Sequence, residues 1–346
     1  LVIEAGLRYD RFDPKSRFPV VPGYFRPDEP EDFMDAPVQA VWSPRLGVSF
    51  PVTENSTFRL SYGHFAQVPD LNEYYQGKNL EYFTYKVTNT NDYFARPLEM
   101  GKTIAFEFGF RQLLGPDFVL DISAYNKDKL ADVALRKLPY NDPTRPGAVT
   151  WLNTFTNADY GTIRGVDVRV DRRFGRLLDV MGGYSYQDAR GTGTDPYTYA
   201  DVFARTESSA ATLLGQPTNP AQAIRPIEEN RVHNISGNFV FHVPADYEEF
   251  PAWARNVALT GTVRFASGLP YTRVTGVGSD YVVGPPTDLG LSGTLRYDDI
   301  STNRMPWRKL VDMKISKGIE FAGMNTHLFA DIRNLFDFDN WTLVFL

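Results

Sequence analysis

Apolar and polar residues alternate along most of this chain with a period of two. Ile3 and Leu7 fall on one face of the first segment, whereas Glu4 and Arg8 fall on the other. This alternation is the signature of a β-strand that lies between an apolar and a polar environment. It recurs in about eleven segments of about ten residues, which is the length of a strand that crosses a bilayer at a tilt. The clearest segment, 98–112, carries Met100, Ile104, Phe106, Phe108 and Phe110 on one face and Glu107, Gly109 and Arg111 on the other.

The connections between these segments alternate between short and long. The short ones lie near 53–55, 113–116, 174–176, 244–255 and 318–323, and the long ones near 13–41, 69–97, 128–160, 191–230 and 269–306. Compact soluble domains favour connections of about four to six residues throughout, whereas outer-membrane barrels have short periplasmic turns and long extracellular loops. The pattern therefore predicts an all-β fold, an antiparallel transmembrane β-barrel with the long connections outside. A soluble antiparallel sheet with one face on a core gives the same alternation and is the alternative fold.

The composition narrows the possible functions. The mean hydropathy is -0.32 and the formal net charge is -6, so the chain has no basic surface for nucleic acid. It has no cysteine, and its four histidines do not occur in a metal-binding spacing. No nucleophile elbow or phosphate-binding glycine motif is present. The sequence therefore predicts no enzyme, no metal site and no cofactor.

Ligand-binding candidates lie in the long connections, where aromatic rings stand beside hydrogen-bonding groups. Binding residues concentrate on loops held by a rigid scaffold, and aromatic residues and arginines are typical anchors. The alternative is that these rings pack loop against loop. The candidates are Asp70, Asn72, Tyr74, Tyr75, Trp151, Tyr197, Tyr199, Tyr271 and Arg273.

Four short motifs stand out along the chain: Leu98-Glu99-Met100-Gly101-Lys102 with Glu107, Asn157-Ala158-Asp159 leading to Gly165-Val166-Asp167, Ser267-Gly268-Leu269-Pro270-Tyr271, and Arg333-Asn334-Leu335-Phe336-Asp337 with Asn340. Together they resemble motifs in the barrel of TonB-dependent outer-membrane receptors. They occur in the order that the family has. The large loops and the third motif are similar to the Oar-like branch of these receptors.

The resemblance implies that the chain is the C-terminal half of a receptor in the bacterial outer membrane. Such receptors have a barrel of about 22 strands with a plugged lumen. Residues 1–346 are then one partial barrel domain that lacks the plug, the first strands and a complete last strand. The implied partners are outer-membrane lipid, the receptor's own N-terminal plug, and a TonB-type energy-coupling protein that binds the missing N-terminal region.

The resemblance further implies active uptake of a scarce extracellular solute. A siderophore, a glycan and a peptide suit the loops equally well. The alternative function is a passive porin or a surface adhesin, which needs the same strands but no plug.

Overall fold

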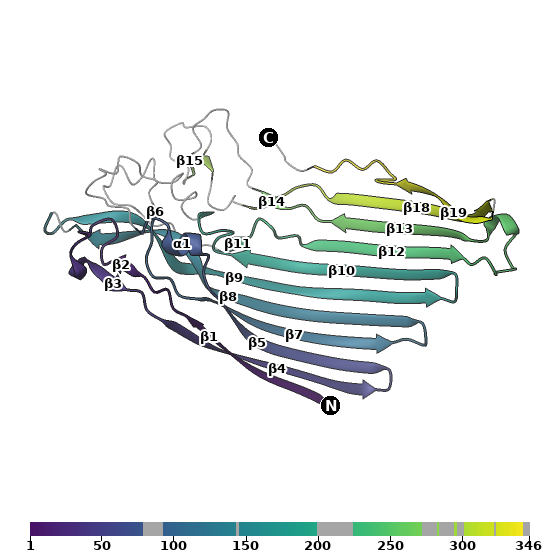
Figure 1. Cartoon of the computed structure of the whole chain (residues 1–346), viewed down its shortest axis with the longest axis horizontal. Coiled ribbons are helices and arrows are strands. Elements are labelled where there is room, and N and C mark those ends of the chain that lie inside the picture. The colour runs from purple at the N-terminus through teal and green to yellow at the C-terminus, as the bar shows by residue number, and fades with distance from the viewer. Residues whose placement is uncertain are drawn as a thin grey trace.

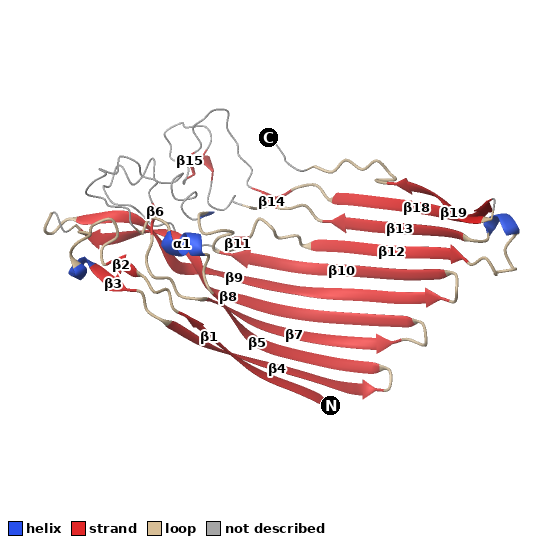
Figure 2. Ribbon diagram, viewed as in Figure 1, coloured by secondary structure: helices blue, strands red, loops and turns tan. Residues whose placement is uncertain are grey.

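The computed structural model describes residues 1–78, 93–142, 145–198, 224–271, 282–283, 294–295, 301–321 and 323–341. Long antiparallel strands lie side by side in one curved sheet, with tight turns at one end and larger connections at the other (Figure 1). Apart from two one-turn 3-10 helices, α1 (Leu71–Tyr75) and the single helical residue Thr198, the regular structure in these residues is strand (Figure 2). The all-β antiparallel fold is confirmed.

The wall of the molecule is a path of eleven strands in the described residues, each paired with its neighbours along the chain. In order, these are β1 (Val2–Phe12), β4 (Gln39–Thr53), β5 (Ser56–Gln67), β7 (Gly101–Leu113), β8 (Phe118–Asn141), β9 (Val149–Phe174), β10 (Leu178–Gly191), β12 (His233–Val243), β13 (Val257–Ala266), β18 (Arg308–Phe321) and β19 (Met324–Ile332). Within the described residues, β1 and β19 each pair with one strand, so the sheet is open at these two edges.

The short connections lie where the alternation predicts them. Residues 54–55, 114–117 and 175–177 join consecutive wall strands at one end of the sheet. Gly115 and Gly175 have φ of 80° and 61°, a left-handed backbone that glycine adopts without steric cost. The fourth connection, 244–256, contains the 3-10 helix η2, Ala252–Ala254.

The long connections carry short elements of their own. The first contains β2 (Arg17–Pro19), the 3-10 helix η1 (Pro30–Asp32) and β3 (Phe33–Asp35), and the second contains α1 and β6 (Tyr93–Phe94). The fourth contains β11 (Arg225–Pro226). The fifth contains β14 (Pro270–Tyr271), β15 (Val282–Val283), β16 (Thr294–Leu295) and β17 (Asn303–Arg304).

The expected long loop at 128–160 is wrong. Strand β8 continues for 24 residues and β9 for 26, so the two form a hairpin that extends past the neighbouring strands. The register shifts on either side of Asp132, which pairs with Asp159, and Ala131 beside it has φ of 59°. Regular pairing then runs from Ala134 opposite Thr156 to Asn141 opposite Val149. The connection itself is only 142–148. The extension does not alternate cleanly, because Ala134 and Leu135 are both buried although they point to opposite faces.

The strand registers place apolar residues opposite apolar residues, and polar opposite polar, from one strand to the next. One row of directly opposed residues reads Ile3, Val48, Leu60, Phe108, Ala124, Val166 and Tyr186. A row on the other face reads Ser49, Arg59, Gly109, Ser123, Asp167, Ser185 and Asn234. The polar face holds ion pairs such as Arg59 with Asp121, at 2.9 Å. A wall with one apolar and one charged face suits lipid on one side and a polar interior on the other.

Aromatic rings gather toward both ends of the apolar face. Toward the long connections, Tyr9 packs on Trp42 with ring centroids 4.6 Å apart, and His233 stacks on Trp307 at 5.8 Å. Toward the short turns, Phe58 packs on Phe50 at 5.0 Å. Aromatic belts of this kind lie where a bilayer meets water. The described part of the chain has no helix long and apolar enough to span a membrane.

Candidate functional site

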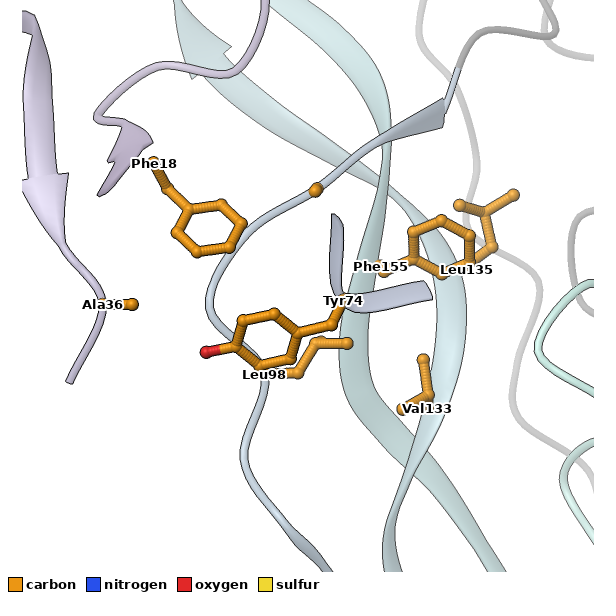
Figure 3. Packing of buried hydrophobic residues seen from close by; sticks show 8 residues of the cluster. Phe18, Ala36, Tyr74, Leu98, Val133, Leu135 and Phe155 are labelled. Atoms are coloured by element: carbon orange, nitrogen blue, oxygen red, sulfur yellow. The ribbon is translucent and has the colours of Figure 1, made fainter. Parts of the chain in front are cut away.

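The long connections fold into one assembly with a core of its own. We call this the loop assembly; it comprises the described parts of 13–41 and 69–98, the extension of the β8–β9 hairpin beyond Leu130, and residues 191–198. Side chains from these separate segments meet in its interior (Figure 3). The buried residues are Phe18, Ala36, Tyr74, Ala95, Leu98, Val133, Leu135 and Phe155.

Helix α1 is positioned by the residue that precedes it and by a buried aromatic ring. The Asp70 carboxylate accepts a hydrogen bond from the Asn72 backbone N–H at 2.8 Å, which caps the helix. Tyr74 is fully buried and packs edge-on against Phe12 and Phe18, with centroids 5.4 and 5.5 Å away. Burial raises the pKa of its phenol to about 12. The neighbouring Tyr75 donates its hydroxyl to the Pro14 carbonyl at 3.2 Å.

Two polar side chains connect the hairpin extension to the other segments. The Asn157 amide donates to the carbonyls of Glu99 and Ala131 and accepts from the Glu99 N–H, at 2.7 to 2.9 Å. The resembling motifs around residues 99 and 157 are therefore in direct contact. Asp159 accepts from Arg136 at 2.6 Å and from Thr192 at 2.8 Å. Burial raises the pKa of Asp159, and these partners offset part of that rise.

A cavity of about 320 Å³ lies where the loop assembly meets the polar face of the wall. Its wall side is formed by β5, β7 and β8 where they reach the loop assembly. The wall residues Gln67, Thr103 and Lys129 lie on the same polar face of the sheet as Arg59 and Asp121. Its loop side comes from the second and fourth long connections and the base of the hairpin extension. Carboxylates dominate the charged lining, which consists of Asp70, Glu73, Asp132, Asp159 and Asp195 together with Lys102 and Lys129.

The carboxylates of the cavity influence one another. The pKa of Glu73 is raised by burial and by its negative neighbours Asp70, Asp132 and Asp195. The pKa of Tyr197 is raised by burial, with Glu73 among the contributing charges. Lys129 and Asp132 form an ion pair at 2.5 Å. The cavity is thus a negative site that favours cationic or hydrogen-bond-donating groups.

Five of the predicted site residues, Asp70, Asn72, Tyr74, Tyr75 and Tyr197, come from the segments 69–78 and 191–198 that supply the loop side of this cavity. Asp70 lines it, and Asn72 is exposed on α1 next to it. Tyr75 and Tyr197 are half-buried against the core, and the Tyr197 hydroxyl donates to Gln76 at 3.1 Å. Tyr74 belongs to the core itself, so its ring stabilises the loop assembly and is not open to a ligand.

Two further predicted site residues lie elsewhere. Trp151 is half-buried in the hairpin extension, opposite Pro139. Tyr271 lies in β14, paired with Asn303 of β17. Neither lines the cavity. Tyr199 and Arg273 fall outside the described residues.

Most of the cavity's charged residues are not among the site residues that the sequence predicts. Glu73 stands within the same short segment as Asp70 and Tyr74, so its position in a polar-aromatic loop was a usable signal. Asp132, Asp159 and Asp195 lie far apart in the chain and carry no such signal. In the described residues, no group of three or more His, Asp or Glu side chains could hold a metal ion.

Comparisons with known proteins agree with this architecture. Residues 1–335 match the family described as TonB dependent receptor-like, beta-barrel. No curated protein matches the chain.

Solved transporters from two bacteria share the fold. The outer membrane transporter YddB from Escherichia coli is 12% identical, with a TM-score of 0.53, over 86% of this chain and 37% of that structure. The F3-3 variant of the FrpB iron transporter from Neisseria meningitidis is 15% identical, with a TM-score of 0.50, over 97% of this chain and 38% of that structure. At these identities the likeness shows the fold, and the chain spans well under half of either relative. The family match covers nearly the whole chain, so the protein belongs to the TonB-dependent receptor β-barrel family of the bacterial outer membrane.

Proposed function

We propose that this chain forms the wall and the loop cover of a receptor that actively imports a scarce solute. The observation that carries the proposal is the cavity, which opens onto the polar face of the wall beneath the loop assembly. A solute captured from outside would there be held next to the barrel interior, through which it must pass. The excess of carboxylates favours a ligand with amine, guanidine or other donor groups, which peptides, glycans and siderophores can all carry.

The chain itself performs no chemistry in this proposal. The wall supplies shape and charge, and the loops supply the first binding surface. A plug domain and a TonB-type protein that transmits energy from the inner membrane are the expected partners. The long connections face outside the cell, and the short turns face the periplasm.

A deletion strain tests the proposal at the level of uptake. Growth on single nutrients should identify one solute whose uptake needs the full-length receptor, and that uptake should stop when the energy-coupling protein is deleted. Uptake that persists without energy coupling would support a passive porin instead. A strain that loses adhesion but no uptake would support an adhesin.

Paired variants test the cavity. Glu73→Gln with Asp132→Asn should lower uptake of the identified solute while surface expression stays normal, because two of the lining carboxylates lose their charge. The control is Asp28→Asn, an exposed loop carboxylate outside the cavity. Equal uptake by both variants would show that the solute binds elsewhere.

A further inference from the structure

One connection at the short-turn end is unlike the others. Residues 244–256 join β12 to β13 through thirteen residues, whereas 54–55, 114–117 and 175–177 are brief turns. Because a wall strand needs only a tight turn to reverse direction, most of this connection is available for another role.

The connection has a defined conformation. Arg255 donates from Nε to the Phe250 carbonyl at 2.8 Å and from Nη2 to the Glu248 carbonyl at 3.2 Å. The exposed Asp246 carboxylate accepts from Arg176 in the adjacent turn at 3.0 Å, which links the two connections. Between these two attachments, η2 makes one 3-10 turn, closed by the bond from Ala254 N–H to the Pro251 carbonyl at 2.8 Å.

The connection folds toward the apolar face of the wall. The Phe250 ring lies 6.4 Å from that of Phe241, which stands opposite Leu178 and Leu259 on this face. The Lys317 ammonium, on the same face, donates to the Arg255 carbonyl. Val243 ends β12 on this face and is only 2% exposed, as expected beneath a connection that turns back over it.

Trp253 projects from η2 into the surroundings. Its side chain is 79% exposed, the highest value among the large hydrophobic residues that the structure describes. Holding a large apolar ring in water contributes nothing to the stability of the fold. An indole at the edge of a lipid-facing surface, by contrast, is placed at the headgroup level, where its apolar ring and its N–H are both satisfied.

We propose that the 244–256 connection is a membrane-binding foot, which inserts Trp253 into the headgroup region of the phospholipid leaflet at the short-turn end. This contact would extend the lipid-facing surface of the wall past the end of β12. The proposal therefore rests on the sheet crossing the membrane. The exposed Glu248 and Glu249 disfavour anionic lipid, so the ligand is a zwitterionic phospholipid surface.

Fluorescence of the full-length receptor in phosphatidylcholine vesicles tests the proposal. The emission difference between the wild type and Trp253→Phe isolates this one indole from Trp42, Trp151, Trp307, Trp341 and any tryptophan elsewhere in the receptor. We expect that difference to be blue-shifted from the emission of tryptophan in water. Lipids brominated near the headgroup should quench it more than lipids brominated deep in the chain.

A second variant separates this proposal from the membrane placement itself. Phe106→Trp on the Trp253→Phe background puts an indole in the middle of the apolar face, where deep bromines should quench it. If deep bromines quench this probe but only aqueous iodide quenches Trp253, the connection does not bind lipid and the proposal is wrong. The exposed indole would then be available to a periplasmic partner. If the Phe106→Trp probe is not quenched either, the wall does not cross the bilayer and both inferences fail.

Discussion

The wall and the loop assembly of this receptor chain bury their apolar residues in opposite ways. On the wall, Ile3 is 61% exposed and Phe106 is 44% exposed, and both point away from the polar face. In the loop assembly, Phe18, Tyr74 and Phe155 are 0% exposed and belong to one buried cluster. The same residue types thus lie outside in one region and inside in the other.

The difference follows from the solvent around each region. The wall has its backbone satisfied by strand pairing, which lipid requires, and lipid then covers its apolar side chains. The loop assembly stands in water, so its rings are buried as in any soluble domain. Each region should therefore respond to its own kind of substitution, and three predictions test this from the largest effect to the smallest.

The largest effect is expected in the loop core. Phe155→Ala should destabilise the loop assembly by about 3–5 kcal/mol, because it leaves a cavity among fully buried rings. Hydrogen exchange of the β8–β9 extension would measure the loss, while the wall strands keep their protection. The matched control is Val149→Ala on the same strand, where the side chain is 52% exposed and little should change. Equal protection in both variants would mean that the loops have no packed core.

A smaller effect is expected on the apolar face of the wall. Phe106→Arg should destabilise the membrane-inserted barrel by about 2–4 kcal/mol, because it places a charge against hydrocarbon. Glu107→Arg introduces the same residue one position along, on the polar face, and should cost much less. Denaturant unfolding of the full-length receptor in vesicles compares the two. A larger loss from Glu107→Arg would show that the assigned faces are reversed.

The smallest effect concerns the acidity of the cavity. Because the pKa of Glu73 is raised in the folded loops, its carboxyl favours the folded state while it is protonated at low pH, and this contribution disappears as the pH rises through the raised pKa. At neutral pH, Glu73→Gln should therefore stabilise the loop assembly slightly, by under about 1 kcal/mol because solvent screens the group.

The advantage of Glu73→Gln should shrink as the pH falls, which hydrogen exchange of α1 would follow. An advantage that stays constant with pH would show that the carboxyl does not titrate differently in the folded loops.

The alternating pattern was sufficient to predict the wall. Strand pairing between neighbours in the chain is local, and a side-chain period of two fixes which residues face the same way. The short turns and the two faces could therefore be found without a structure. The family motifs are short runs of consecutive residues, so they too could be found in the sequence. Asn157 and Gly268 occupy motif positions for reasons that only the structure shows. Asn157 bonds the backbone of Glu99, and a Cβ on Gly268 would lie 1.6 Å from the Met305 carbonyl oxygen.

The extension of the β8–β9 hairpin could not be predicted from alternation. Val133, Ala134 and Leu135 are consecutive and all buried, because the other long connections cover both faces of the hairpin there. A strand buried on both faces loses the apolar-polar period that identifies a strand in a wall. The pattern of residues therefore predicts a loop at a point where the described residues form strands buried on both faces.

The sequence by itself determined that this chain is an antiparallel membrane wall with large loops, because those features depend on neighbouring residues and on the solvent of each face. Only the tertiary structure decided how the loops and connections pack. It assigned Tyr74 to a core, brought Glu73, Asp132 and Asp195 to one cavity, and turned the 244–256 connection toward the lipid-facing side. Those contacts join segments far apart in the chain, and no local pattern of residues specifies which distant segments will meet.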